Sequence, residues 1–281
     1  MICSAATRMS EIKQDSRVVL ITGTSSGIGR ASALHLAERG FRVFGTCRRL
    51  EQGPGTFQEL VMDVNDDDSV ERAIDTIYEQ AGRIDVVVNN AGLGYAGAIE
   101  DTSIAEAKAQ FETNFFGTFR VCRAILPRMR AQGDGRIINV SSIGGLIALP
   151  FQGMYCASKF AVEGMTEALR MEVKPFGIKV TLVEPGDFRT AFTQNRSRVH
   201  ASGNGSAYDA RMQSSLVIME RDEQRGPAPI EVARLLEKVI AARNPAPRYS
   251  VGMAYQRLAI VVRRLLPATL FERIIAASYK L

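Results

Sequence analysis

Tyr155 and Lys159 stand four residues apart at the start of a segment whose apolar residues are spaced as in a helix. Residues four apart on a helix lie on one face, so a phenol and an ammonium are expected side by side. A phenol ordinarily titrates at about 10, and a neighbouring cation favours the phenolate and lowers that pKa. The pair predicts a tyrosine that acts as a general acid or base near neutral pH. The alternative is a surface pair with a solvated lysine, because this spacing is common in helices.

A glycine-rich segment near the start of the sequence predicts a nucleotide site. Residues 18–21 form a short apolar run, residues 22–29 carry the pattern Gly-x-x-x-Gly-x-Gly, and a helical pattern follows up to Gly40. Glycines allow a tight turn and a close approach of the backbone to a phosphate, and a helix N-terminus offers unpaired N–H groups. A strand, a glycine loop and a helix in this order favour dinucleotide binding more than the glycines would alone.

Together the two stretches resemble a classical short-chain dehydrogenase/reductase over about residues 17–251. The resemblance extends to further pieces in the same order, namely Asn89–Gly92, Asn114, Asn139–Ser142, Pro185–Gly186 and Thr190. Within that family, residues 155–164 and 184–190 are similar to the 17β-hydroxysteroid and retinol dehydrogenase branch. The resemblance implies a single-domain, Rossmann-like α/β fold, a doubly wound parallel sheet of about seven strands flanked by helices. Alternating strand and helix patterns along the chain favour the same architecture.

The resemblance implies a catalytic set of Asn114, Ser142, Tyr155 and Lys159. Ser142 would bond the substrate oxygen, and Tyr155 would exchange a proton with it. Lys159 would lower the Tyr155 pKa and hold the nicotinamide ribose, while Asn114 would bend its helix and support a proton relay through water. Simpler readings remain, because serine is a common turn former and an interior asparagine can be satisfied by the backbone. No histidine and aspartate pair supports a nucleophilic triad.

The resemblance also implies the cofactor contacts. These are Gly23, Ser25, Ser26, Gly27, Ile28 and Gly29 in the glycine loop, Asp63 and Val64 at the adenine, Asn90, Ala91 and Gly92 on the adenosine side, Tyr155 and Lys159, and Pro185, Gly186, Phe188 and Thr190 near the nicotinamide.

Arg48 bears on which dinucleotide is bound. NAD-selective relatives carry an acidic residue at the end of the second strand, and here residues 41–46 are followed by Cys47, Arg48 and Arg49 instead. A guanidinium suits a 2′-phosphate. The sequence therefore favours NADP(H) over NAD(H), with Arg48 as the contact, and a solvated loop arginine is the alternative.

The remaining elements are predicted from apolar periodicity and stop signals. Residues 65–68 read as a helix start rather than a metal site. We expect strands at 60–64, 84–88, 136–140, 179–183 and 248–251, and helices at 69–81, 104–131, 155 to about 174 and 229–243.

Composition narrows the class of protein. The chain has 281 residues, 46% of them hydrophobic, which is enough for one large core. A net charge of +5 without a basic block interleaved with aromatics argues against nucleic acid. Four cysteines without a paired motif favour reduced thiols in the cytoplasm, and no residues have zinc-ligand spacing, so we expect no metal. We expect residues 1–16 to be a disordered lead, and no apolar run is long enough to span a bilayer.

The C-terminal third is expected to control the substrate. Residues 187–229 read as a lid with a helix over 208–219, whose apolar residues predict a hydrophobic carbonyl or alcohol substrate that is steroid-, retinoid- or lipid-like. Residues 252–281 read as a basic amphipathic helical extension, which predicts peripheral contact with a membrane surface or packing against the lid or a partner subunit. Members of the family are often homodimers or homotetramers through the helices that contain Asn114 and Tyr155. The expected function is interconversion of an alcohol and a ketone or aldehyde. The alternative is a catalytically silent sensor or scaffold, which would not need the four catalytic residues.

Overall fold

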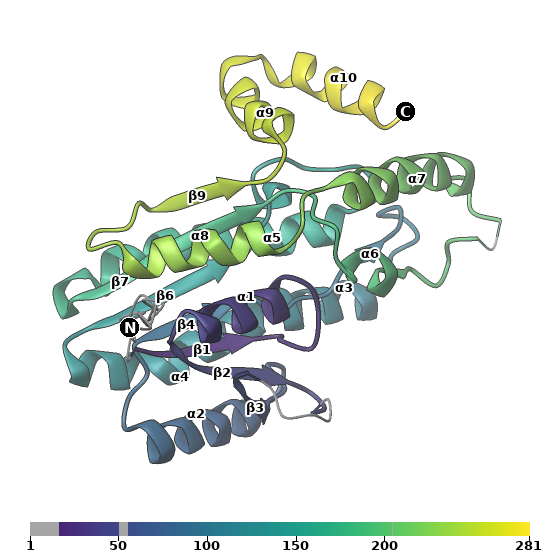
Figure 1. Ribbon diagram of the computed structural model, residues 1–281. Helices are drawn as coiled ribbons and strands as arrows, with labels where there is room; N and C mark the ends of the chain where they lie inside the picture. Colours follow the sequence, from purple (N-terminus) through teal and green to yellow (C-terminus); the bar gives the residue numbers. More distant parts are fainter. Residues whose placement is uncertain (1–16, 51–55, 204) are drawn as a thin grey trace, which may run out of the picture.

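A seven-stranded, entirely parallel sheet forms the centre of the computed structural model (Figure 1), which describes residues 17–50, 56–203 and 205–281. The predicted lead at residues 1–16 lies outside the described residues. The strands stand in the order β3, β2, β1, β4, β6, β7, β9. Their bounds are β1 Val18–Thr22, β2 Arg42–Cys47, β3 Gln58–Val61, β4 Val86–Asn89, β6 Gly135–Val140, β7 Ile178–Pro185 and β9 Arg248–Val251. The predicted doubly wound α/β fold is confirmed.

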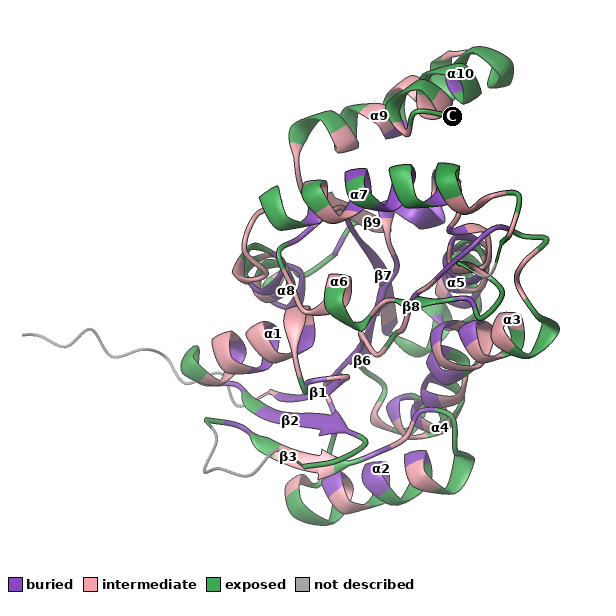
Figure 2. Ribbon diagram, turned by 90° about the vertical axis from the view of Figure 1, so that its right-hand side faces the viewer, coloured by how far each residue is buried: buried purple, intermediate pink, exposed green. Residues whose placement is uncertain are grey.

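Helices cover both faces of this sheet (Figure 2). Because successive side chains of a strand point to opposite faces, Leu20 of β1 packs with one cluster, and Val19 and Ile21 pack with the other. The first cluster joins α2 Asp67–Ala81, α4 Gly117–Gln132 and α5 Gly153–Glu172, and the second joins α1 Gly27–Glu38 and α8 Ile230–Ala241. The near-continuous apolar runs in the strands follow from burial on both faces.

The strand order places the crevice of the fold beside β1. The chain winds outward from β1 through β2 to β3 and then crosses back to β4, so the loops after β1 and β4 diverge at their carboxyl ends. Open α/β sheets bind ligands at such a switch point.

The predicted helix over 104–131 is divided into two by a wider turn. α3 spans Ile104–Phe111, a π-helical turn spans Glu112–Phe116, and α4 follows. The turn contains Asn114, whose side chain bonds groups outside the helix. π-turns inside helices are common at functional sites.

Two other boundaries differ from the prediction. β3 ends at Val61, so Asp63 and Val64 lie in the loop after the strand rather than within it. The C-terminal extension forms two helices, α9 Ala254–Leu265 and α10 Ala268–Ser278. Pro267 stands between them and precludes continuation of α9, because proline lacks the N–H that the helix needs.

Short elements and the C-terminal helices cover the carboxyl ends of β6 and β7. These are β5 Tyr95–Ala96 paired with β8 Ser197–Arg198, α6 Phe192–Asn195, α7 Asp209–Arg225 and the 3₁₀ turn Ile143–Gly145. A second 3₁₀ turn, Lys174–Phe176, joins the end of α5 to the start of β7 at the opposite edge of the sheet. Ile260 of α9 and Phe271 of α10 pack on Ile143 and Ile147, and Tyr279 packs against α7. Within the described residues, no helix combines the length and apolar character needed to cross a membrane.

Gly29 provides a test of the close packing between the start of α1 and the loop after β4. A Cβ at this position would lie 2.1 Å from the Gly23 carbonyl oxygen and 2.5 Å from Asn90 Nδ2. We expect Gly29→Ala to lower the free energy of unfolding by about 1–3 kcal/mol, measured in urea, because the backbone must shift. Gly164→Ala is the control, since a Cβ there meets nothing within 4 Å and alanine favours a helix by about 0.5–1 kcal/mol. Equal effects of the two changes would contradict this packing argument.

Candidate active site

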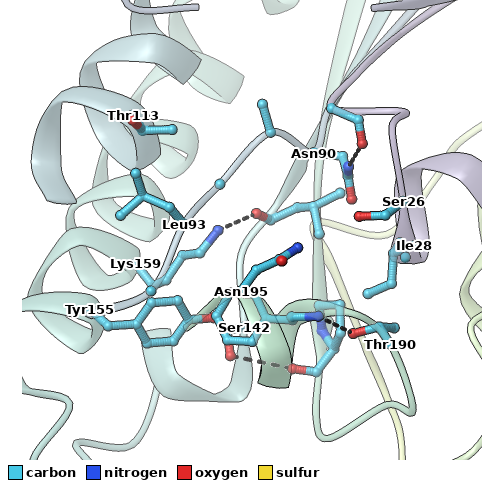
Figure 3. A pocket seen from close by; sticks show the side chains of 18 of the residues that line it. Ser26, Ile28, Asn90, Leu93, Thr113, Ser142, Tyr155, Lys159, Thr190 and Asn195 are labelled. Atoms are coloured by element: carbon cyan, nitrogen blue, oxygen red, sulfur yellow. Dashed lines mark hydrogen bonds between the residues drawn. The ribbon is translucent and has the colours of Figure 1, made fainter. Parts of the chain in front are cut away.

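A cavity of about 560 Å³ opens at the carboxyl ends of the central strands. It brings together the glycine loop after β1, the segment after β4, the loops after β6 and β7, and the first turns of α5 (Figure 3). The glycine-rich segment at residues 22–29 and the segment that begins with Tyr155 therefore meet in one cavity.

Two positions of the glycine loop require glycine, both because of a positive φ and one also because of close packing. Gly23 has a φ of 72°, and a Cβ there would lie 2.8 Å from Ala91 Cα. Gly27 has a φ of 59° and faces Thr190, which lies 3.4 Å from where a Cβ would be. The first turn of α1 has no acidic residue, and its N-cap Ser26 makes no side-chain cap bond. The helix N-terminus thus presents N–H groups and a positive dipole end to the cavity, which fits a dinucleotide phosphate.

Asn90 ties the end of β1 to the loop after β4. Its side-chain Nδ2 donates to the carbonyl oxygens of Thr22 at 2.9 Å and Gly23 at 3.1 Å, and the backbone N–H groups of Asn90 and Ala91 donate to Thr22 Oγ1. These bonds hold the end of β1 against the loop after β4, and Asn90, Ala91 and Gly92 also line the cavity.

Ser142 and Tyr155 point into the same part of the cavity (Figure 3). Ser142 extends from the loop after β6, where its Oγ accepts a hydrogen bond from Gly144 N at 3.0 Å. A Cβ on Gly144 would lie 3.2 Å from the Tyr155 ring and 3.4 Å from Ser142 Oγ, so the two side chains flank this glycine. The ring of Phe192 lies beside Tyr155 with 5.8 Å between the ring centroids.

Burial, rather than Lys159, determines the acidity of Tyr155. Desolvation raises the Tyr155 pKa to about 12, and the side-chain hydrogen bond with Ser142 opposes this rise. The prediction that Lys159 lowers this pKa is therefore wrong for this arrangement. The phenol is protonated throughout the neutral range and is a proton donor there.

Lys159 is buried on the same face of α5, and its Nζ donates to Val140 O at 2.9 Å (Figure 3). Burial lowers the Lys159 pKa to about 8, and the carboxylate of Glu163 opposes this change. The ammonium is held against the end of β6 rather than bonded to the tyrosine, which explains why it does not dominate the tyrosine's pKa.

Asn114 lies behind the cavity rather than in its lining. Its Nδ2 donates to Leu93 O at 3.0 Å and to Ser158 Oγ at 3.1 Å, and its Oδ1 accepts from Leu93 N at 2.9 Å. The π-turn of Asn114 is thereby joined to the segment after β4 and to α5, beside Lys159. The helical segment is interrupted at Asn114 by this π-turn, at the residue where the resemblance implies a bend.

The other predicted contacts are distributed around the cavity. Arg48 is exposed at the end of β2 and lines it, while the Phe188 side chain packs into the core between the sheet and α8. The cavity is lined by all predicted site residues except Asn114 and Gly29. Those not yet placed are Ser25, Ile28, Asp63, Val64, Pro185 and Gly186.

Several lining residues were not predicted as site residues. Tyr279 comes from the end of α10, Glu223 and Met219 from α7, Asn195 from α6 and Gln152 from the turn before α5. Met219 was expected only as part of an apolar lid. No local motif marks Tyr279, Glu223, Asn195 or Gln152 as cavity residues. Tyr279 reaches the cavity through the packing of the end of α10 on α7.

Two curated relatives are similar over most of the chain. 3-Ketodihydrosphingosine reductase of Bacteroides thetaiotaomicron is 43% identical over 263 residues, which cover 94% of this chain and 98% of the relative. 17-Beta-hydroxysteroid dehydrogenase type 1 of Homo sapiens is 37% identical over 258 residues, which cover 83% of this chain and 76% of the relative.

Solved structures with dinucleotides share the fold. A short-chain dehydrogenase/reductase of Burkholderia phymatum in complex with NAD has a TM-score of 0.76 and 26% identity, and the match covers 90% of this chain and 93% of that one. An alcohol dehydrogenase of Thermococcus sibiricus with 5-hydroxy-NADP has a TM-score of 0.68 and 26% identity, with 86% and 99% covered. These neighbours support a nicotinamide cofactor. The family described as short chain dehydrogenase also matches residues 17–200, and the chain belongs to the short-chain dehydrogenase/reductase family of oxidoreductases.

Proposed function

We propose that the chain is an NADP(H)-dependent oxidoreductase that interconverts an alcohol and a ketone or aldehyde on a hydrophobic, lipid- or steroid-like substrate. The observation that carries this proposal is the convergence of Ser142 and Tyr155 on a cavity that also holds the glycine loop and the N-terminus of α1. A silent sensor would have no use for this convergence.

The proposed roles follow from the protonation states of the side chains. A bound nicotinamide dinucleotide supplies or accepts the hydride. Ser142 donates a hydrogen bond to the substrate oxygen and holds it beside Tyr155. During reduction Tyr155 protonates the developing alkoxide, which its neutral phenol can do because its pKa is about 12. Oxidation needs the phenolate and is therefore favoured by rising pH.

Lys159 and Asn114 support the tyrosine in this scheme. Lys159 holds the nicotinamide ribose and places a positive charge near the proton donor while it is an ammonium, below about pH 8. Asn114 holds the Leu93 backbone and Ser158 in place and supports proton movement through water beside Lys159.

The outer part of the cavity supports a hydrophobic substrate. Leu149, Phe192, Met219 and Tyr279 contribute apolar surface beside Tyr155 and Ser142. The names of the two relatives, a 3-ketodihydrosphingosine reductase and a 17-beta-hydroxysteroid dehydrogenase, favour long or polycyclic ketones over small polar ones. A panel of such ketones with NADPH absorbance as the readout tests the substrate class.

Two exposed apolar surfaces support the proposed partners. Phe116, Phe119 and Phe160 are exposed at α4 and α5, which supports a homodimer or homotetramer through these helices. On α9 and α10 the exposed side chains of Leu258, Leu265 and others lie among arginines, which supports contact with an anionic membrane surface. The packing of Tyr279 against α7 places the other, inward face of this extension on the lid.

Tyr155→Phe tests the proposed chemistry. It removes the proton donor and keeps the ring, so we expect kcat for ketone reduction to fall by about 10²–10⁴-fold with unchanged NADPH affinity. Tyr279→Phe is the matched control, because it removes a hydroxyl from the same cavity at a position without a proposed role in proton transfer, and it should retain most of the turnover. Turnover that survives in Tyr155→Phe would rule out the proposed proton donor.

Arg48→Ala tests the cofactor preference. Loss of a charge-assisted bond to the 2′-phosphate should raise the NADPH dissociation constant by about 10–100-fold and leave NADH binding unchanged. Arg49→Ala is the control, since Arg49 is exposed one residue further on and does not line the cavity. Fluorescence titration of both dinucleotides measures this, and a wild-type preference for NADH would remove the role assigned to Arg48.

Phe119→Asp and Leu258→Glu test the two surfaces and serve as controls for each other. We expect Phe119→Asp to reduce the sedimentation mass to that of a monomer while binding to anionic phospholipid vesicles is kept. Leu258→Glu should keep the oligomer and lose most vesicle binding, because a carboxylate is repelled by the anionic surface. Wild-type chain that sediments as a monomer contradicts the first proposal, and wild-type chain that leaves the vesicles unbound contradicts the second.

A further inference from the structure

A buried carboxylate lies one helical turn beyond Lys159 and has no part in the scheme above. Glu163 occupies the same face of α5 as Lys159, and each residue is only 6% exposed. Within the described residues, neither carboxylate oxygen of Glu163 has a hydrogen bond of ordinary geometry, although the hydroxyl of Ser141 lies close enough to lower the Glu163 pKa. A buried, unbonded carboxylate is costly unless an opposite charge is close by, so its presence needs a physical reason.

Arg248 of β9 is the cation that contacts this carboxylate. Its Nη1 lies 3.5 Å from Glu163 Oε2 and 3.2 Å from Oε1 of Glu184 in β7, and its Nη2 pairs with Glu167. Glu184 is fully buried, and its Oε2 accepts a hydrogen bond from Ser250 Oγ at 2.5 Å. One guanidinium thus faces two buried carboxylates and cannot neutralise both.

Lys159 supplies the second positive charge. Its Nζ is bonded to the neutral carbonyl of Val140, and Glu163 is the carboxylate that favours its charged form. The arrangement balances two cations, the buried Lys159 and the partly exposed Arg248, against two buried carboxylates, Glu163 and Glu184. This balance connects the site to the edge strand β9 through α5.

We propose that Glu163, held by Arg248, is a positioning residue that keeps Lys159 charged inside the protein and thereby sets the alkaline limit of the reduction. The part of this proposal that concerns the alkaline limit of the reduction rests on the proposed function. The part that concerns the charge of Lys159 does not.

The sign of the effect follows from the groups that face Glu163. These are Lys159 and Glu167 on α5, Ser141 after β6, Glu184 on β7 and Arg248 on β9. Burial, helped by Glu184 and Glu167, raises the Glu163 pKa to about 7, while Ser141 and Arg248 lower it. The carboxylate is therefore mainly charged at pH 8, where Lys159 begins to lose its proton. Its removal lowers the Lys159 pKa, and the ammonium is lost at lower pH.

Glu163→Gln tests this proposal, with two readouts. We expect the alkaline limb of kcat/KM for NADPH-dependent reduction to move down by about one pH unit. In protein with ¹³C-labelled lysine side chains, the NMR titration of the Lys159 Cε signal, assigned by its loss in Lys159→Arg, should move by the same amount. Glu163→Asp retains the charge and should restore most of both values.

Glu167→Gln is the matched control, because Glu167 also pairs with Arg248 and is largely exposed. Its removal lowers the Glu163 pKa, so the Glu163 carboxylate stays charged and neither readout should move down. Ser141→Ala is a second variant, which removes the hydroxyl that favours the charged form of Glu163. It should lower the Lys159 pKa less than Glu163→Gln does. If the Lys159 titration moves in neither Glu163→Gln nor Ser141→Ala, the proposal is overturned.

The same experiment separates the two proposals. A wild-type chain that turns over ketones while Glu163→Gln leaves both readouts unchanged contradicts only the role of Glu163. A Lys159 titration that moves in a chain without turnover supports the electrostatic link and contradicts the proposed function.

Discussion

Desolvation of Lys159, which is buried, and of Tyr155, which is half-buried at the wall of the cavity, is the constraint on which the chemistry of the site depends. Burial acts in opposite senses on the two groups, because it disfavours the charged form of each. It raises the tyrosine pKa, so the phenol keeps its proton, and it lowers the lysine pKa, so the ammonium is close to losing its own. A site built in this way has a proton donor at neutral pH, whereas its positive charge depends on other buried groups. The carboxylate of Glu163, one helical turn from Lys159, is the group to which we assign that support.

The parallel sheet explains why these two side chains meet at one cavity. The carboxyl ends of β1, β4, β6 and β7 lie at one edge, so the loops that follow them converge on one cavity. Glycines let these loops approach closely, as at Gly23, where a side chain would meet Ala91. Side-chain amides then join these segments by hydrogen bonds. Asn90 joins the ends of β1 and β4, and Asn114 joins the segment after β4 to α5. The cavity is thus rigidly framed on its cofactor side.

The sequence predicts most residues on the glycine-loop side of the cavity and few of those on the side formed by α6, α7 and α10, for a physical reason. Residues such as Gly23, Ser142 and Tyr155 act through local turns and helical spacing, which short patterns specify. The pKa of Tyr155 was predicted with the wrong sign because it depends on burial by groups that are remote in sequence. Tyr279 could not be assigned to the cavity from its local pattern, since it arrives there only through the packing of α10 on α7. The π-turn at Asn114 likewise results from bonds to Leu93 and Ser158 that no periodicity encodes.

The C-terminal helices connect the cavity to the surface of the molecule. Their inner residues pack on the loop that follows Ser142, and Gln256 of α9 bonds Asp187 after β7 through both its amide oxygen and its amide nitrogen. Their outer residues form the exposed apolar and basic surface. A change in how α9 and α10 lie therefore alters the outer wall of the cavity and the exposed surface together. Under the proposed function, a hydrophobic substrate that partitions into lipid meets both surfaces. The proposed substrate choice and the proposed membrane contact then depend on the same packing of Ile260 and Phe271 on Ile143 and Ile147.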